Sequence, residues 1–491
     1  MSRADILFTH SYFLRFDPKE FRAMTPYPPL GTLYAAALAR SLGLRPALFD
    51  SMLAADEAEI VPLLRALKPR VLAIYDDDFN YLTKMCLSRM REAAYALVRS
   101  GRENGCTVIV HGSDAADHAE EYIARGADYV IRGEGEGPLE GLLRALFGGA
   151  GDPRAVQGIV FREGAGVDRT APHAAAKNLD ALPLPAWDLI DADRYRDLWV
   201  KRHGYFSLNM VTTRGCPFHC NWCAKPIYGQ TYVSRSPAHV VDELLHLRAT
   251  LRPDHIWFCD DIFGLKPGWI EEFSAEVERR GARTPYKCLA RVDLLLKGDV
   301  IRHLAASGCT SVWVGAESGS QKILDAMEKG TTVGQIIEAS RRLKEAGIRT
   351  GFFLQFGYPG ETRSDIDLTL GMLRECRPDD IGISVSYPLP GTPFYERVRR
   401  SLGGKRNWTV SEDLDLMFPG EFHPDFYRAL HAVTHKRLRI WQGLDQARGM
   451  ARAPWSATPA RIRRVALSAY HLITLPYHQR KMHALEKPVQ A

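Results

Sequence analysis

Short apolar segments alternate with amphipathic stretches along most of the chain, in two successive series. The segments of the first series lack the polar alternation of a half-exposed strand, and helical patterns such as 30–42 and 82–102 lie between them. Unbroken apolar strands that alternate with helices are typical of a parallel sheet covered on both faces. The pattern predicts an α/β fold with a Rossmann-like domain over residues 1–148. Its expected strands are 5–8, 45–50, 71–75, 107–112 and 129–135.

The second series follows a connector, residues 149–200, that is rich in Gly, Ala, Asp and Pro. Apolar strands again alternate with helical patterns, so we expect a second parallel sheet within residues 201–400. A helical region, 401–491, completes the expected organisation. The expected strands of the second series are 206–212, 255–260, 287–293, 311–317, 349–356 and 381–387.

Composition and charge narrow the class of protein. With 491 residues, 46% hydrophobic and 25% charged, the chain is of globular type and long enough for about two or three domains. Nine cysteines, an odd number, fit a reducing compartment better than a disulfide framework. No apolar run reaches the roughly 18 residues of a membrane span. The first residues of the chain have the pattern of a buried strand and not that of a signal peptide. We therefore expect a cytoplasmic protein.

The positive charge is concentrated at the end of the chain. Residues 451–491 contain seven Lys or Arg and one Glu, which accounts for the whole net charge of +6. The remainder is close to neutral, so no nucleic-acid partner is expected. Between 461 and 473 an apolar stripe, interleaved with arginines, predicts a basic amphipathic helix that docks on the rest of the protein or makes a peripheral contact with a membrane surface. We expect docking. The stripe consists of Ile462, Val465, Ala466, Ala469 and Ile473.

Three cysteines lie within eight residues, at Cys216, Cys220 and Cys223, just after the expected strand 206–212. A cubic iron–sulfur cluster normally takes four thiolates, so a loop with three leaves one iron open to a substrate or cofactor. The alternatives are a zinc site and a coincidental cluster of thiols, but zinc prefers four protein ligands in a closed site. His219 lies between two of the cysteines and would have to fold back on its own loop. We therefore interpret the loop as a site for a 4Fe–4S cluster.

The spacing Cys-x-x-x-Cys-x-x-Cys, with Trp222 before the last cysteine, resembles the motif of the radical SAM superfamily. In that family the open iron is chelated by S-adenosylmethionine, and reduction of the cluster releases a 5′-deoxyadenosyl radical. The resemblance implies that residues 201–400 form a partial (β/α)6 barrel with the cluster loop after its first strand. It also implies an electron donor such as flavodoxin or ferredoxin.

The same resemblance assigns S-adenosylmethionine contacts to the ends of the barrel strands. Asp260 or Asp261 could accept the ammonium group, although the wider superfamily often has Gly-Gly-Glu there and Asp261 could simply cap a helix. Arg291, at the end of the third strand, suits a carboxylate or ribose. Glu317, at the end of the fourth strand, lies in Trp-Val-Gly-Ala-Glu, which resembles a Gly-x-x-Glu segment that lines the site.

Two proline-containing turns follow the last two barrel strands. The turn that contains Gly357 and Pro359 resembles the segment whose backbone packs against adenine, which glycine permits because it has no side chain. Residues 386–395 lie where substrate is expected, or their prolines only make a rigid turn.

The front domain followed by this barrel resembles the cobalamin-binding group of radical SAM enzymes. The run Asp-x-His-x-x-Gly, whose histidine ligates cobalt in other cobalamin domains, is missing from the sequence, and His10, His111 and His118 are more typical of structural histidines. The resemblance thus implies cobalamin bound without a histidine ligand, and the alternative is a related fold that binds nothing. The implied contacts are Pro29, Leu30, Gly31, Gly112, Gly133 and Glu134.

These resemblances imply an enzyme that functionalises an unactivated carbon of a small-molecule or lipid-like substrate, by hydrogen abstraction and methyl transfer from methylcobalamin. A second enzymatic interpretation keeps both cofactors but transfers no methyl group, as in oxidative cyclases of tetrapyrrole synthesis or rearrangement enzymes. From a different class, the chain could be a cobalamin-responsive binding protein with an inert cluster.

Overall fold

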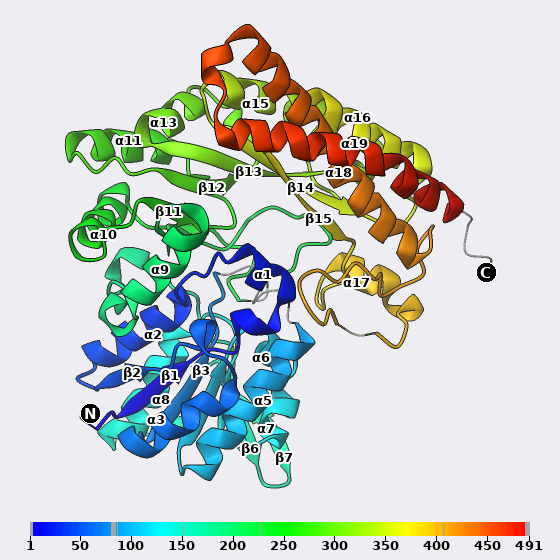
Figure 1. Ribbon diagram of the computed structural model, residues 1–491. Coiled ribbons are helices and arrows are strands. Elements are labelled where there is room, and N and C mark those ends of the chain that lie inside the picture. The colour runs from blue at the N-terminus through cyan, green and yellow to red at the C-terminus, as the bar shows by residue number, and fades with distance from the viewer. Residues whose placement is uncertain are drawn as a thin grey trace. The chain divides into compact units, whose positions relative to one another are not determined.

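The computed structural model describes residues 3–79, 85, 87–149, 151–225, 227–405 and 407–486, apart from the side chain at position 456. The chain forms two compact units (Figure 1). The first consists of Met1–Phe218, Lys225–Cys288 and Asn407–Asp413, and the second of His219–Ala224, Leu289–Arg406 and Leu414–Ala491.

A seven-stranded sheet forms the front of the first unit, in the order β2-β1-β3-β4-β5-β6-β7. The first five strands pair in parallel, as their apolar sequences predict, and the last two add antiparallel. The strands are β1 (Ile6–Thr9), β2 (Pro46–Leu48), β3 (Val71–Tyr75), β4 (Thr107–His111), β5 (Tyr129–Ile131), β6 (Ile159–Glu163) and β7 (Gly166–Arg169).

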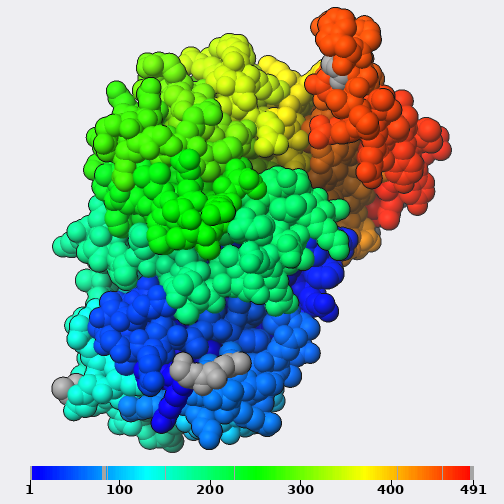
Figure 2. Space-filling model, turned by 60° about the vertical axis from the view of Figure 1, so that its left-hand side comes forward, coloured from blue at the N-terminus to red at the C-terminus, as the bar shows by residue number. Residues whose placement is uncertain are grey.

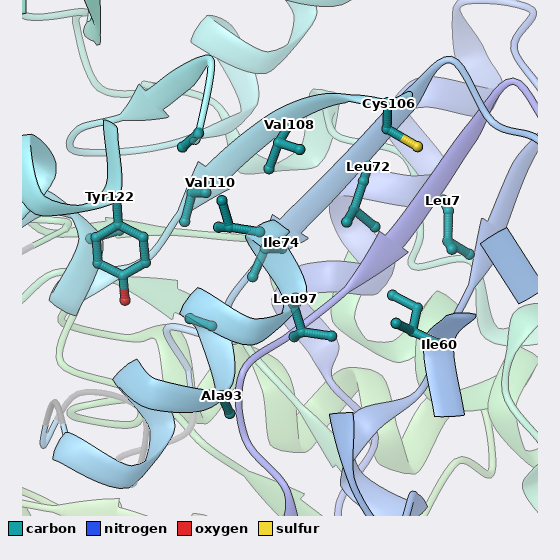
Figure 3. Close-up of a cluster of buried hydrophobic side chains, with 14 of the residues drawn as sticks. Leu7, Ile60, Leu72, Ile74, Ala93, Leu97, Cys106, Val108, Val110 and Tyr122 are labelled. Atoms are coloured by element: carbon teal, nitrogen blue, oxygen red, sulfur yellow. The ribbon is translucent and has the colours of Figure 1, made fainter. Parts of the chain in front are cut away.

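Helices cover both faces of this sheet. They are α2 (Leu30–Ser41), α3 (Ile60–Leu67), α5 (Ser88–Glu103), α6 (Ser113–Asp117), α7 (Ala119–Ala124) and α8 (Glu136–Gly148), and the short helix α1 (Pro18–Ala23) precedes them in the chain. Side chains alternate between the faces with a period of two, so Leu72 and Ile74 pack on one side and Val71 and Ala73 on the other. Figure 3 shows the first of these clusters, in which Leu72 and Ile74 pack near Leu97 of α5. The first residues of the helix expected at 82–102 lie outside the described residues.

The first unit also contains the beginning of the second strand series. Strand β11 (His255–Phe258) pairs in parallel with β8 (Ser207–Met210) and β12 (Tyr286–Ala290), and the first unit ends within β12. A short antiparallel ribbon, β9 (Thr213–Arg214) and β10 (Val233–Ser234), follows β8. The helices of this part are α9 (Ala192–His203), α10 (Pro237–Thr250) and α11 (Trp269–Arg279).

The second unit continues the strand series with three long parallel strands in the order β13-β14-β15. These strands are β13 (Cys309–Glu317), β14 (Arg349–Phe356) and β15 (Asp380–Val385). Helices α15 and α16 begin with side-chain capping boxes, at Thr332 with Gln335 and at Thr362 with Asp365. The helices are α12 (Val292–Leu295), α13 (Val300–Ser307), α14 (Gln321–Ala326), α15 (Val333–Glu345), α16 (Arg363–Cys376), α17 (Pro393–Val398), α18 (Pro424–Arg452) and α19 (Pro459–Ala484).

The predicted fold class is confirmed: the molecule is α/β, with a Rossmann-like front sheet, a series of barrel-type parallel strands and a helical C-terminal region. The β6–β7 hairpin was not predicted, because it lies in the polar connector and only β6 contributes buried residues, Ile159 to Phe161. The predicted domain boundaries stay predictions. Among the described residues, no helix is long and apolar enough to cross a membrane.

Candidate active site

The cysteine loop begins in the first unit, where backbone packing holds its start. Gly215 has φ +78°, and a Cβ there would collide with the carbonyl oxygen of Thr231, so only glycine fits. Cys216 is buried, and its thiol is not part of a disulfide. The strand end before the loop is held by Asp260, which lies at the end of β11.

Asp260 is 2% exposed and already accepts three hydrogen bonds. Its carboxylate oxygens receive the backbone N–H groups of Thr212 and Thr213, at 2.7 and 2.8 Å, and the Thr212 hydroxyl at 2.7 Å. Burial nevertheless raises the pKa of Asp260 to about 6. Asp261 is exposed, and the next helix starts only at Trp269, so Asp261 does not cap it.

In the second unit the loop is anchored by Asn221, which is fully buried between Cys220 and Cys223. Its backbone N–H donates to the Met327 carbonyl at 3.1 Å, and its side-chain amide donates to the Ala326 carbonyl at 2.8 Å. The Tyr358 hydroxyl donates to the Asn221 side-chain oxygen at 3.0 Å. Sequence reasoning missed Asn221, because its partners come from α14 and from the turn after β14.

Trp222 lies against the apolar cluster that contains Met327, Tyr358 and Phe394. Its indole Nε1 is buried and has no hydrogen-bond partner within the described part of the chain. The Lys329 ammonium lies 5.7 Å from the centre of the indole ring, within cation–π range. A buried donor without an acceptor is costly in a protein and is often satisfied by a ligand.

A buried ion pair stands at the end of β13. The Lys329 ammonium donates to Glu317 Oε1 at 2.8 Å, and both residues are less than a tenth exposed. Burial acts to lower the pKa of Lys329, but the negative charges of Glu317 and Cys220 outweigh it and the pKa is raised. Lys329 was also missed from the sequence, because it lies in a loop twelve residues beyond Glu317.

The backbone at Glu317, which carries one side chain of this pair, has an unusual conformation. Glu317 has φ +55°, and the register of β13 shifts between Gly315 and Glu317. A Cβ at Gly315 would collide with the carboxylate of Glu317 and the ammonium of Lys329. Non-glycine residues in this conformation are uncommon and concentrate at functional sites.

Arg291 completes the cluster of charges in the second unit. It is 6% exposed, and its guanidinium donates to the Lys329 carbonyl at 3.0 Å and to Asp293 at 3.0 Å. Its Nη1 lies 3.9 Å from the sulfur of Cys220. The structure therefore brings together four predicted residues, Cys220, Trp222, Arg291 and Glu317, around one that was not predicted. We call Arg291, Glu317 and Lys329 the charged triad.

The turn after β14 is built around Gly357, which has φ +77°. Its N–H donates to Glu361 Oε2 at 2.6 Å, and a Cβ would approach Tyr427 and Leu416 to 3.2 and 3.1 Å. Glu361 is 1% exposed, and burial raises its pKa to about 8. Pro359 is half-buried in the same turn.

Buried polar atoms without partners collect at the ends of β14 and β15. Gln355 Oε1, Glu361 Oε1 and the Ser386 hydroxyl have no hydrogen-bond partner among the residues that the structure describes. All three side chains belong to the second unit, as the charged triad does. Native proteins leave few buried polar groups unsatisfied, so these atoms are candidates for contacts with a ligand.

The strand ends of the front sheet carry three consecutive aspartates, Asp76 to Asp78, which are all buried. The Ser11 N–H donates to Asp76 at 2.7 Å and the Gly31 N–H to Asp77 at 3.0 Å. Burial raises the pKa of both carboxyls, that of Asp76 to about 6. Sequence reasoning did not single out these aspartates, although a run of acidic residues directly after an apolar strand was a visible signal.

The predicted cobalamin residues lie around the same strand ends. Pro29 and the fully buried Leu30 begin α2, and a Cβ at Gly31 would approach Asp77 Cα to 3.2 Å. Gly112 has φ +147°, and a Cβ there would meet Asp76 Cβ at 2.8 Å. Gly133 has φ +73° with open space beside it.

Glu134 belongs to a second buried ion-pair network. Its carboxylate pairs with Arg214, which also donates to Glu136 at 2.6 and 3.0 Å. Burial acts to lower the pKa of the guanidinium, but Glu136 and the other charges raise it well above its ordinary value. Arg214 lies two residues before Cys216, so this network holds the start of the cysteine loop to the front sheet.

The three histidines of the front domain all have protein partners. His10 contacts Asp50 at 3.2 Å, His111 bonds the Gly133 carbonyl at 3.0 Å, and His118 contacts Glu121 at 3.2 Å. His111 is also stacked on Tyr75, with ring centres 4.1 Å apart, and burial lowers its pKa.

No three His, Cys, Asp or Glu side chains in the described ranges are grouped so as to hold a single metal ion. His219, the possible fourth zinc ligand, is exposed. The thiolates of a cubic cluster each ligate a different iron, so they need not converge on one point.

The part of the chain that contains these residues is similar to a known protein family. Residues 210–373, which contain the three cysteines and the charged triad, match the radical SAM superfamily. This match confirms the radical SAM domain that the cysteine motif predicted.

Relatives and solved structures refine this class. The chain is 27% identical, over 80% of its length and 83% of the relative's, to an uncharacterized methyltransferase of Pyrococcus horikoshii. It is 29% identical, over 55% of its length and 45% of the relative's, to the anaerobic magnesium-protoporphyrin IX monomethyl ester cyclase of Cereibacter sphaeroides.

Two solved structures share the fold. The cobalamin-dependent S-adenosylmethionine radical enzyme OxsB, with aqua-cobalamin and S-adenosylmethionine bound, matches 99% of this chain and 76% of its own, with a TM-score of 0.72 and 17% identity. The radical S-adenosylmethionine methyltransferase TsrM of Kitasatospora setae, with cobalamin and a [4Fe-4S] cluster bound, matches 83% of this chain and 76% of its own, with a TM-score of 0.65 and 20% identity. The predicted resemblance to the cobalamin-binding group is confirmed for the fold.

Proposed function

We propose that the protein is a cobalamin-dependent radical SAM methyltransferase that methylates an unactivated carbon of a small molecule. Cys216, Cys220 and Cys223 would hold a 4Fe–4S cluster. The observation that carries the proposal is the charged triad next to Cys220, which provides two buried cations and one buried carboxylate beside a cluster ligand. When bound, the cofactors would supply hydrogen abstraction and the methyl group, while the protein orients them and excludes water.

The triad matches the chemistry of the methionyl end of S-adenosylmethionine, which carries one ammonium and one carboxylate. Glu317 can accept the ammonium, and the Arg291 guanidinium offers a fork of donors to the carboxylate. The Lys329 ammonium pairs with the Glu317 carboxylate in the same cluster.

The strand ends next to the triad suit the rest of the cofactor. The backbone at Gly357 carries no side chain that would block a flat ring, and Pro359 lies in the same turn. Gln355 and Ser386 offer buried polar atoms that lack partners in the described chain. We assign these positions to adenosine. Asp260 instead braces the strand before the cysteine loop, and Asp261 remains the predicted candidate for a polar contact there.

The front sheet suits cobalamin held without a histidine ligand. The corrin carries many amide side chains, which donate hydrogen bonds, and the strand ends present the buried carboxylates of Asp76 and Asp77. His10, His111 and His118 are each held by protein groups. Gly31, Gly112 and Gly133 would allow the backbone to approach the macrocycle.

Cleavage of S-adenosylmethionine consumes one electron, so the proposal includes a protein electron donor such as flavodoxin or ferredoxin. A second candidate is an oxidative cyclase that transfers no methyl group, which the likeness to the anaerobic cyclase favours.

The test is anaerobic reconstitution of the full chain with iron, sulfide and cobalamin, followed by reduction in the presence of S-adenosylmethionine that carries a deuterated methyl group. The proposal expects the absorption of both iron–sulfur and cobalamin, formation of 5′-deoxyadenosine, and a product that carries the label. An unlabelled cyclised product would favour the cyclase. Cobalamin binding with no 5′-deoxyadenosine would favour the binding protein.

A further inference from the structure

The basic amphipathic helix predicted near the end of the chain exists as α19, and it docks on α18 as expected. The docked side is not the predicted apolar stripe. Ser468 and Met482 are the buried residues of α19, and Gly443 of α18 lies so close to Ser468 that a Cβ there would collide with it. Lys436 of α18 donates to the Thr474 hydroxyl at 2.8 Å. The contact between the two helices therefore combines small and polar residues with the buried Met482.

Four of the five residues of the apolar stripe are exposed instead, and Val465 is half-buried. Ile462 is 55% exposed, Ile473 79% and Tyr477 68%, although such side chains are usually buried. Positions 462, 466, 469, 473 and 477 recur at three and four, so they share one side of the helix. Tyr470, next to this side, is 58% exposed. In Figure 2 the turn between α18 and α19 (orange) projects from the second unit, and Trp455 in this turn is 86% exposed.

Exposed basic side chains lie on the same helix, and we call them its basic rim. Arg463, Arg464, Arg480 and Lys481 are exposed on α19. The one acidic residue between 451 and 491, Glu486, is paired with Arg363. Such a helix can lie parallel to the surface of an anionic bilayer. Its apolar and aromatic side chains would enter the bilayer, and its basic side chains would contact the anionic lipids.

We propose that α19 binds the surface of an anionic membrane through the side formed by Ile462, Ala466, Ala469, Ile473 and Tyr477. A second copy of the chain fits less well. In a symmetric dimer the same patch meets itself, which would place the basic rim of one copy against that of the other. The proposal is independent of the proposed reaction, and it would place the enzyme where a lipid-like substrate is available.

The test is flotation of the reconstituted full-length protein with vesicles of phosphatidylcholine, with and without phosphatidylglycerol. We expect flotation only with the anionic vesicles, and weaker flotation at high salt. The double variant Ile473→Glu/Tyr477→Glu should lose binding. Leu368→Glu on α16, at a side chain that is 55% exposed in the same unit, is the matched control and should float as the wild type does.

The basic rim is tested separately by Arg463→Gln/Arg464→Gln. Each cation near such a surface contributes about 1 kcal/mol, so we expect roughly 10-fold to 30-fold weaker partitioning. All three variants change exposed side chains and should keep the wild-type melting temperature. The proposal is overturned if the protein does not float, or if Ile473→Glu/Tyr477→Glu floats like the wild type. It is also overturned if that variant instead converts a lipid-free dimer to a monomer.

Discussion

The strand ends of the front sheet and the end of β13 both bury carboxylates, but the carboxylates of the two regions have different partners. Asp76 and Asp77 receive backbone N–H groups, and burial raises the pKa of each carboxyl. Glu317 instead pairs with the Lys329 ammonium beside Arg291. Carboxylates held by neutral donors suit a large ligand rich in amides, whereas a cluster of full charges suits a small zwitterion. The difference between the two regions therefore separates the two cofactors that we propose.

The largest effect is expected for Cys220→Ala. Removal of one of three cluster thiolates should abolish formation of 5′-deoxyadenosine, while cobalamin binding, which depends on the front sheet, should be unchanged. Absorption spectra and chromatographic assay of 5′-deoxyadenosine check both parts. Cys376→Ala, at a buried cysteine on α16, is the control and should keep both properties. Loss of cobalamin in Cys220→Ala would show that the two sites are not separate.

The next effect is expected for Lys329→Met, which leaves the Glu317 carboxylate buried without its partner. Breaking a buried pair in this way costs about 3–5 kcal/mol of the free energy of unfolding. The double variant Lys329→Met/Glu317→Gln removes both charges and should recover most of that stability. Neither variant should bind S-adenosylmethionine normally, as calorimetric titration would show. Normal affinity in the stable double variant would limit the pair to a structural role.

The pH dependence of stability distinguishes the carboxyls of the two regions. Glu361 has a folded pKa of about 8, above its ordinary value of 4.5, so between these values the folded state holds a proton that the unfolded state has lost. Stability should therefore fall as pH rises through this window and level off above pH 8. From pH 6 to 8 the loss is on the order of 2–3 kcal/mol. For Asp76, with a folded pKa of about 6, the corresponding fall ends near pH 6.

Denaturant unfolding across this pH range checks the assignment to Glu361. Glu361→Gln should remove the fall in stability between pH 6 and 8, and Asp76→Asn should leave it in place. A slope that survives in Glu361→Gln would assign it to another group.

The smallest effect is expected for Gly112→Ala. Its φ of +147° and the 2.8 Å approach to Asp76 disfavour any side chain, so we expect a loss of about 1–3 kcal/mol in stability and weaker cobalamin binding. Gly371→Ala, inside α16 with open space around it, should be neutral or stabilising by about 0.5–1 kcal/mol. Thermal or chemical unfolding measures the change in stability of both variants. An Ala at position 112 that leaves stability and cobalamin affinity unchanged would contradict the close packing at this strand end.

The sequence predicted the repeating strands and helices well, because an apolar run bounded by glycine or proline is a local signal. It also singled out Arg291 and Glu317, at the ends of apolar strands, whose contact with a cofactor stays a prediction. Asn221 and Lys329 could not be recognised, because their importance depends on partners distant in the chain, such as Tyr358 for Asn221. The sequence could not predict which side of α19 docks. The stripe that contains Ile462 and Ile473 identifies an apolar face of the helix, but it does not show whether another part of the protein covers that face.

The most direct test of the central claim, a cubic cluster with one iron open to S-adenosylmethionine, is electron paramagnetic resonance of the reduced, anaerobically reconstituted enzyme before and after S-adenosylmethionine is added. We expect the signal of a reduced 4Fe–4S cluster that shifts when S-adenosylmethionine binds. A protein that contains zinc or no metal at Cys216, Cys220 and Cys223, or a cluster signal that S-adenosylmethionine leaves unchanged, would contradict it.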